Sequence, residues 1–397
     1  MRSIIQTQGI HHITLNGADK KTSVQFWQDI LGMPLIFEQP NLDDLSTNHL
    51  YFDCGDGPIR RPLRKRYCMG ENTIKSLLRI ENNAEPQKIG FLLLNEFSMI
   101  AFASAIEPLR ASNRQSNQTL FDWVVASTDG NASTASNGMT LQTATETEEL
   151  QSCRMVFVCS GVRVRENTNK SILNLIRRLD RNGAVIGAIC TGTYVMAAAG
   201  LIDGRRCTIH WENIDGLAEE FPHLDITNDL FEIDGNRVTC SGGTASLDMM
   251  LNLITQAHGS ALAAEVSDQF IHDRIREPTD RQRMELRTRL GVSHPKLLAV
   301  VKTMEDNLEE PLAQTDIARM TNLSTRQLER LFRKYLDTTP TRYYLNLRLA
   351  RARHLLRQTS MSILSVALAC GFVSASHFSK CYRECYGRTP RAERSPE

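Results

Sequence analysis

The chain has 397 residues, of which 41% are hydrophobic and 23% charged, a composition typical of soluble globular proteins. No apolar run approaches the roughly 18 residues that cross a bilayer, so we expect no membrane contact. The N-terminus lacks the continuous apolar segment of a signal peptide. Ten cysteines are scattered without a Cys-x-x-Cys pair, which predicts a reducing, cytoplasmic location.

Charge is distributed unevenly along the chain. The net charge is +1, but residues 315–394 carry 15 Lys and Arg against 5 Asp and Glu. This stretch therefore holds an excess of positive charge, and the remainder is acidic. A basic end on an acidic body predicts a module that binds a polyanion, although a solvated basic helical surface has the same composition.

Residues 1–57 contain the pattern of a strand, a helix and further strands from residue 9 onward. This segment resembles part of the first βαβββ module of the vicinal oxygen chelate (glyoxalase) superfamily, because His12 matches the first metal ligand and "FWQDILGMPL" matches the helix-to-strand step. Metal sites of that family draw ligands from paired modules, and no second module follows. His12 and His49 alone do not make a site, so we predict no bound metal. Residues 58–86 are predicted to be a basic linker, with Met69 as an alternative start.

Strands alternate with helices over residues 87–265. Buried strand patterns occur at 88–94, 121–127, 154–160, 184–189 and 236–240, with helical patterns between and after them. Such alternation predicts an α/β fold with a doubly wound parallel sheet. Ligands bind at the carboxyl ends of the strands in sheets of this kind.

The stretch "AVIGAICTGTYVMAAAG" stands out within this domain. A strand pattern ends at Cys190, and a Thr-Gly step leads into an apolar helix, which is how a nucleophile is presented on a sharp turn. A working cysteine needs a nearby base to form its thiolate, and His210 is a candidate. Three interpretations stay open: a catalytic Cys190–His210 pair, the floor of a ligand pocket, and a small buried residue at a tight turn.

The domain resembles the PfpI branch of the class I glutamine amidotransferase-like fold, on the strength of "AICTG", His210-Trp211 and "CSGGT" at 240–244. The resemblance implies a glutamate from the first strand–helix loop that supports the cysteine. Ile100 stands at the aligned position, and Glu96 is four residues earlier. Aromatic faces such as Trp211 and Phe97 suit a trimethylammonium group. Backbone N–H groups near Thr191 and Gly192 suit a carboxylate.

Residues 266–296 are charged and are broken by Pro278, Gly291 and Pro295, which predicts a linker with helical pieces. Beyond it, residues 317–340 and 366–390 repeat each other. Each copy has the pattern of helix, turn and helix, and one helix over 342–358 joins them. Two such units on a rigid helix can enter successive major grooves about 34 Å apart.

Residues 297–397 resemble the AraC/XylS family DNA-binding domain, an all-α double helix-turn-helix. The resemblance is carried by Ser324-x-Arg326-x-Leu328, by Gly371-Phe372-x-Ser374 and by the closing Gly387-x-Thr389-Pro390. Asp337 stands where the family often has Gly, and Asp tolerates left-handed backbone. The residues predicted to contact double-stranded DNA are Ser324, Arg326, Gln327, Arg330, Arg333, Lys334, Ser374, Ser376, His377, Lys380 and Arg383.

The combination of domains resembles the GlxA-type regulators of the AraC family, and residues 207–250 resemble the branch that senses glycine betaine, carnitine or arginine. This implies a dimeric activator of a catabolic operon that works with RNA polymerase. A DNA-binding domain needs an input, so we prefer a ligand sensor to a PfpI-type hydrolase and predict no catalytic residue and no cofactor. The predicted ligand-binding residues are Glu96, Phe97, Cys190, Thr191, Gly192, His210, Trp211 and Glu212.

Overall fold

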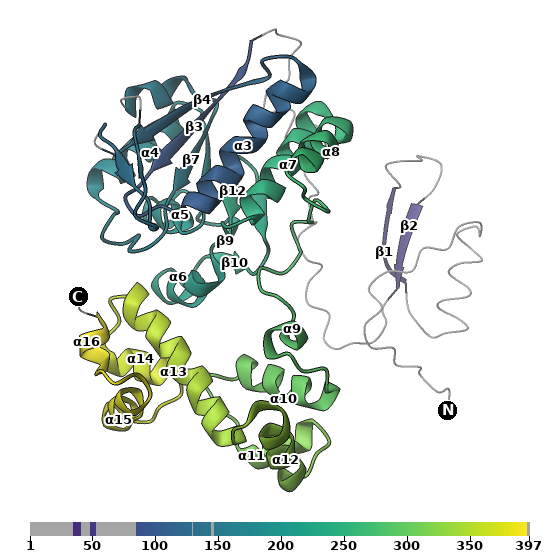
Figure 1. The fold of residues 1–397 in the computed structure, drawn as a ribbon, viewed down its shortest axis with the longest axis vertical. Helices are drawn as coiled ribbons and strands as arrows, with labels where there is room; N and C mark the ends of the chain where they lie inside the picture. The colour runs from purple at the N-terminus through teal and green to yellow at the C-terminus, as the bar shows by residue number, and fades with distance from the viewer. Residues whose placement is uncertain (1–34, 41–47, 53–84, 129, 144–146, 395–397) are drawn as a thin grey trace. The chain divides into compact units, whose positions relative to one another are not determined.

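The computed structural model describes residues 35–40, 48–52, 85–128, 130–143 and 147–394 (Figure 1). The chain forms two compact units, Met1–Cys68 and Met69–Glu397. In the first, strand β1 (Leu35–Pro40) pairs antiparallel with β2 (Asn48–Phe52). The helix predicted for this unit, His12 and the basic linker lie outside the described residues. No helix in the described part is long and apolar enough to cross a membrane.

A six-stranded sheet organises the α/β domain of the second unit. Its strand order is β11-β12-β8-β7-β3-β4, and every neighbouring pair is parallel except β11 with β12. This confirms the predicted doubly wound sheet. The strands are β3 (Gln87–Leu93), β4 (Phe121–Ser127), β7 (Met155–Cys159), β8 (Val185–Ile189), β11 (Phe231–Asp234) and β12 (Arg237–Cys240).

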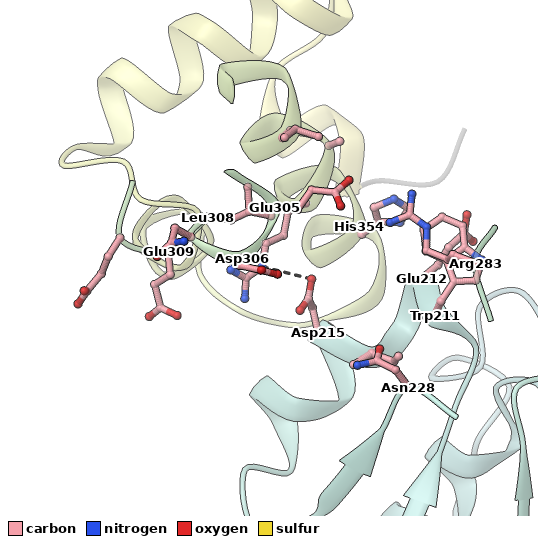
Figure 2. Close-up of a pocket in the computed structure, with 16 residues that line it drawn as sticks. Trp211, Glu212, Asp215, Asn228, Arg283, Glu305, Asp306, Leu308, Glu309 and His354 are labelled. Carbon is pink, nitrogen blue, oxygen red and sulfur yellow. Dashed lines mark ion pairs between the residues drawn. The ribbon is translucent and has the colours of Figure 1, made fainter. Parts of the chain in front are cut away.

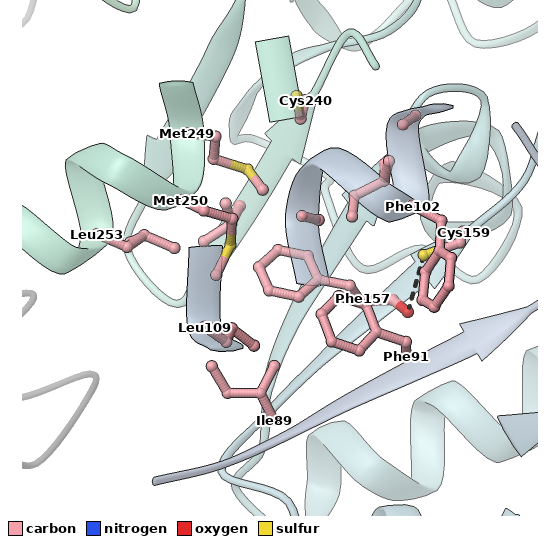
Figure 3. Close-up of a cluster of buried hydrophobic side chains, with 14 of the residues drawn as sticks. Ile89, Phe91, Phe102, Leu109, Phe157, Cys159, Cys240, Met249, Met250 and Leu253 are labelled. Carbon is pink, nitrogen blue, oxygen red and sulfur yellow. Dashed lines mark hydrogen bonds between the residues drawn. The ribbon is translucent and has the colours of Figure 1, made fainter. Parts of the chain in front are cut away.

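Helices cover both faces of this sheet. Phe91 and Leu93 belong to a core packed under α3 (Met99–Ser116), α7 (Ala245–His258) and α8 (Ser260–Gln269). Leu92 and Leu94 belong to a second core with α4 (Lys170–Arg181) and α5 (Gly192–Ala198). Alternate residues of one strand therefore enter opposite cores, as a pleated strand requires. Figure 3 shows the first core, where the rings of Phe91 and Phe157 stack 5.9 Å apart.

Shorter elements fill the connections of the α/β domain. Strand β9 pairs in parallel with β10, and β5 pairs antiparallel with β6. The 3-10 helix η3 and helix α6 follow His210 directly. The bounds are β5 (Ser133–Thr134), β6 (Thr140–Leu141), η2 (Thr147–Ser152), β9 (Arg206–Thr208), η3 (Trp211–Asn213), α6 (Ile214–Glu220) and β10 (Asp225–Thr227).

The C-terminal helices form two small cores that share one helix, α13. Tyr344 of α13 packs in the first core, and Leu349 and Leu355 pack in the second. Thr339 caps α13 and Pro340 is its first residue, which suits proline because its missing N–H is not needed there. The helices are α9 (Leu286–Leu290), α10 (Pro295–Asp306), α11 (Gln314–Met320), α12 (Thr325–Leu336), α13 (Pro340–Gln358), α14 (Ile363–Ala369), α15 (Ala375–Tyr386) and α16 (Pro390–Arg394).

The internal repeat is visible in the backbone. Asn322 and Gly371 occupy matching turns with φ of 53° and 73°. Asp337 and Gly387 occupy matching helix ends with φ of 48° and 72°. Left-handed backbone ends a helix at both places, and Asn and Asp adopt it at less cost than most residues. The departure at Asp337 therefore preserves the geometry of the repeat.

Candidate functional site

Helix α12 presents a basic face to solvent. Leu328 and Phe332 are buried in the first helical core, whereas Arg326, Arg330, Arg333 and Lys334 are exposed. Its first turn is fixed by a capping box, in which the Ser324 backbone N–H donates to Gln327 Oε1 at 2.8 Å and the Gln327 N–H donates to Ser324 Oγ at 3.2 Å. Ser324 and Gln327 therefore hold the start of the helix, and the four basic side chains point outward.

Helix α15 repeats this arrangement. Ser374 caps it by accepting a hydrogen bond from the His377 N–H at 3.3 Å. Phe378 and Tyr382 are buried. The predicted DNA contacts Ser376, His377, Lys380 and Arg383 are all exposed. Of the predicted contacts in the two copies, Ser324, Gln327 and Ser374 thus have a capping role, and the others are exposed on two matching surfaces. One of these, His377, lies 3.4 Å from the Cys381 thiol through its Nε2 atom.

The Cys190 turn is tightly packed. Strand β8 ends at Ile189, and Cys190 adopts a left-handed φ of 60° before α5 begins at Gly192. A Cβ atom on Gly192 would lie 2.1 Å from the Val158 carbonyl oxygen, and one on Gly242 would lie 2.6 Å from Cys190 Cβ. Thr191 donates its hydroxyl to the Gly161 carbonyl at 2.7 Å. Gly192 of "CTG" and Gly242, the first glycine of "CSGG", are therefore required by close packing around the turn.

The Cys190 thiol lies in a poor setting for a nucleophile. Burial, with the neighbouring Cys240 and Glu212, raises its pKa to about 12, although the Thr191 N–H acts in the opposite direction. A thiol with this pKa is protonated at neutral pH. Among the described residues, no hydrogen bond joins Cys190 to His210. The Nδ1 atom of His210 instead accepts from the Glu212 N–H at 3.4 Å, and burial lowers the pKa of His210.

Glu96 and Phe97 lie at the same edge of the sheet as Cys190 but are already engaged. Glu96 forms a two-point ion pair with Arg163, which holds the pKa of that carboxyl below its usual value. Phe97, predicted to face a ligand, is instead fully buried, with its ring 5.7 Å from that of Phe102. The prediction did not foresee Arg163 as the partner of Glu96.

A cavity of about 1090 Å³ lies beside Trp211 and Glu212. One wall comes from the α/β domain, and the other comes from α10, α13 and the loop after α10. Figure 2 shows Trp211, Arg283 and His354 together at one end, with Asp306 and Glu309 toward the other. Asp215 of α6 forms an ion pair with Arg351 of α13 at 3.2 Å, which joins the two walls. Two of the predicted ligand residues thus face this cavity.

Known protein families match both the helical region that carries the basic faces and the α/β domain. Family models match at residues 317–395 (helix-turn-helix domain), 87–256 (DJ-1/PfpI family) and 9–65 (glyoxalase/bleomycin resistance protein/dioxygenase superfamily). The HTH-type transcriptional regulator GbdR of Pseudomonas aeruginosa is 48% identical over 312 residues, which cover 79% of this chain and 85% of GbdR. The regulator CdhR of the same species is 48% identical over 309 residues, 78% of this chain and 92% of CdhR. The chain belongs to the AraC-type transcriptional regulators.

This AraC-type regulator is a ligand-responsive DNA-binding protein with a DJ-1/PfpI-like domain. A solved AraC-type regulator structure from Chromobacterium violaceum is 58% identical, covers 25% of this chain and 89% of its own, and has a TM-score of 0.25.

The segment that connects the two domains of the regulator, residues 270–285, is bound along the α/β domain. Asp248 of α7 is fully buried and accepts hydrogen bonds from the Arg276 N–H at 2.7 Å and from Arg276 Nε at 2.9 Å. It also lies 2.9 Å from His272 Nε2. Arg276 Nη2 donates to Thr244 Oγ1 at 2.8 Å, at the start of α7. The Gln282 amide donates to Thr208 Oγ1 and to two carbonyls at 3.0 Å each.

The prediction of a linker over 266–296 missed this attachment. One signal was present, since Asp248 is the single acidic residue in the apolar run of α7, and a buried carboxylate needs partners. The identity of the partners depends on residues more than twenty positions away. The sequence held no comparable sign that Arg283, His354 and the carboxylates of α10 would line a cavity.

Proposed function

We propose that this regulator binds an operator with α12 and α15 in successive major grooves, as a homodimer in the cytoplasm, and that a small amine or amino acid bound beside the α/β domain alters that binding. Glycine betaine, carnitine and arginine are the candidate inducers. The observation that carries the proposal is the pair of exposed basic faces at the two ends of α13.

The length of α13 suits this task. Its 19 residues span about 28 Å at a rise of 1.5 Å each, close to the roughly 34 Å between successive major grooves on one side of the duplex. Arg326 and Arg330 lie in the first half of α12, where side chains reach base edges, and guanine is the preferred partner of arginine. Arg333, Lys334, Lys380 and Arg383 would neutralise phosphates.

We propose further that the DJ-1/PfpI-like domain acts as a sensor without a catalytic residue. The protonated Cys190 thiol, the Glu96–Arg163 ion pair and the position of His210 support this. Activation of a catabolic operon through RNA polymerase completes the proposed role. The glyoxalase-like segment has no part in DNA binding in this scheme, so a chain that begins at Met69 should bind the operator normally.

The test is operator affinity. A duplex selected from a random pool by binding to the full chain is labelled, and fluorescence anisotropy is measured with Arg326→Ala and Arg330→Ala. Each substitution should weaken specific binding about tenfold, as expected for the loss of one base contact. Arg178→Ala on α4 removes the same charge from the α/β domain and serves as the control. Unchanged affinity in both α12 variants, with an intact fold, would contradict the proposed reading helix.

A further inference from the structure

The aromatic wall of the cavity already carries a cation. The Arg283 guanidinium carbon lies 4.4 Å from the centroid of the Trp211 ring, within the range of a cation–π contact. His354 of α13 approaches the same indole, with ring centroids 6.1 Å apart. In the described part of the chain, no carboxylate lies within ion-pair distance of Arg283. The face of Trp211 is therefore what holds this guanidinium.

The remaining lining makes the cavity favourable for positive charge. Arg283 and Arg351 face the carboxylates of Glu212, Asp215, Glu305, Asp306, Glu309 and Glu310. Three of these are paired, Asp215 with Arg351, Glu305 with Arg289, and Asp306 with Lys302. Within the described ranges, Glu212, Glu309 and Glu310 have no Lys or Arg partner. Burial lowers the pKa of His354, so this imidazole adds little positive charge at neutral pH.

We infer that the face of Trp211 binds the cationic head of the effector, a quaternary ammonium or a guanidinium group, and that Arg283 occupies this place until the effector displaces it. The inference rests on the proposed sensing function and moves the ligand from the Cys190 turn to the cavity between the domains. The volume of about 1090 Å³ exceeds that of most small-ligand pockets, so a small cation fits with room to spare.

This position gives the ligand a means of control. Trp211 belongs to the α/β domain, whereas His354 and Arg351 belong to α13, which joins the two DNA-binding units. A ligand that contacts both walls binds with one affinity when the α/β domain and the DNA-binding domain are in contact and with another when they are apart. It shifts the equilibrium between these two domain arrangements by the difference in binding free energy. Arg283 also follows Gln282, whose amide ties the connecting segment to the α/β domain. Displacing Arg283 would therefore act on the segment that leads to the DNA-binding domain.

The first experiment asks whether charge is recognised. Calorimetric titration of the full chain compares choline with its neutral isostere, in which a tert-butyl group replaces trimethylammonium, and L-arginine with neutral L-citrulline. At least one cation should bind, and its neutral counterpart should bind at least about tenfold more weakly, because a tert-butyl or urea group lacks the attraction to the ring and to the carboxylates. Equal binding of both members of each pair, or no binding of either cation at millimolar concentration, would overturn the inference.

The second experiment locates the site with four variants. Trp211→Leu should weaken binding of the cation about tenfold or more, and Trp211→Phe should weaken it less because an aromatic face remains. Arg283→Gln should strengthen binding by about three- to tenfold, since the competing guanidinium is gone. Arg287→Gln removes a neighbouring exposed arginine outside the cavity and should leave affinity unchanged. Thermal unfolding without ligand verifies that each variant is folded.

The outcomes separate this inference from the proposed function. Cation binding that persists in a folded Trp211→Leu variant, or that weakens in Arg283→Gln, would overturn the cavity site. If operator binding through α12 remained responsive to the same ligand in that variant, the regulator proposal would stand with its ligand elsewhere. If the wild-type chain bound no operator at all, the proposed function itself would be wrong.

Discussion

The Cys190 turn and the cavity beside Trp211 differ in the room and the charge that they offer. At the turn, Cys190 is 8% exposed, and neither Gly192 nor Gly242 has space for an added methyl group. The cavity is wide, and it is lined by ion pairs, free carboxylates and an aromatic ring. A motif inherited with a fold can thus mark a backbone turn that the fold needs, while free volume and unpaired charge mark the place where a ligand fits.

The largest expected effect tests whether the space around the Cys190 turn is filled. Gly242→Ala combines a φ of +87° with a Cβ only 2.6 Å from Cys190 Cβ, so we expect it to lower the free energy of unfolding by about 3–4 kcal/mol. Gly243→Ala is the matched control, because its φ is +57° and nothing lies within 4 Å of the added atom. The control should cost about 1 kcal/mol. Urea denaturation of both variants measures the difference. Equal losses in the free energy of unfolding would show that there is free space beside Cys190.

The next effect concerns the connecting segment, which runs along the α/β domain and supplies Arg283 to the cavity. Asp248→Ala leaves Arg276 and His272 without their buried partner, and we expect a loss of about 3 kcal/mol in the free energy of unfolding. Hydrogen exchange of residues 270–285 should accelerate in the same variant. Asp268→Ala, an exposed position on α8, should change stability by less than about 0.5 kcal/mol. An unchanged exchange rate in Asp248→Ala would mean that the segment is held by its other contacts.

The smallest expected effect is at Cys190 itself. Cys190→Ala should cost no more than about 1 kcal/mol and should leave inducible transcription in a reporter assay intact, because the side chain only fills a small buried space. With a pKa of about 12, the wild-type thiol should react with iodoacetamide far more slowly at pH 7 than the partly exposed Cys385. Abolished induction together with amidase turnover of the purified protein would favour the hydrolase alternative.

The two helical units show how far local pattern can carry a prediction. The caps at Ser324 and Ser374, the buried pairs Leu328–Phe332 and Phe378–Tyr382, and the basic faces follow from helical periodicity alone. The sheet was equally predictable, since buried strands alternate with helices at short range. The capping role of Gln327 was missed, because its side chain turns back to Ser324.

By itself, the sequence determined the order of the domains, the doubly wound sheet, the tight turn at Cys190 and the repeated basic helices. These depend on periodicity and on local backbone preferences within a few residues. Only the tertiary structure decided that Glu96 pairs with Arg163, that Asp248 holds the connecting segment, and that Trp211 faces Arg283 and His354. Each of these contacts joins residues at least 24 positions apart. The strength of each contact depends on how deeply the two residues are buried and on the distance between them. No local sequence pattern determines either quantity.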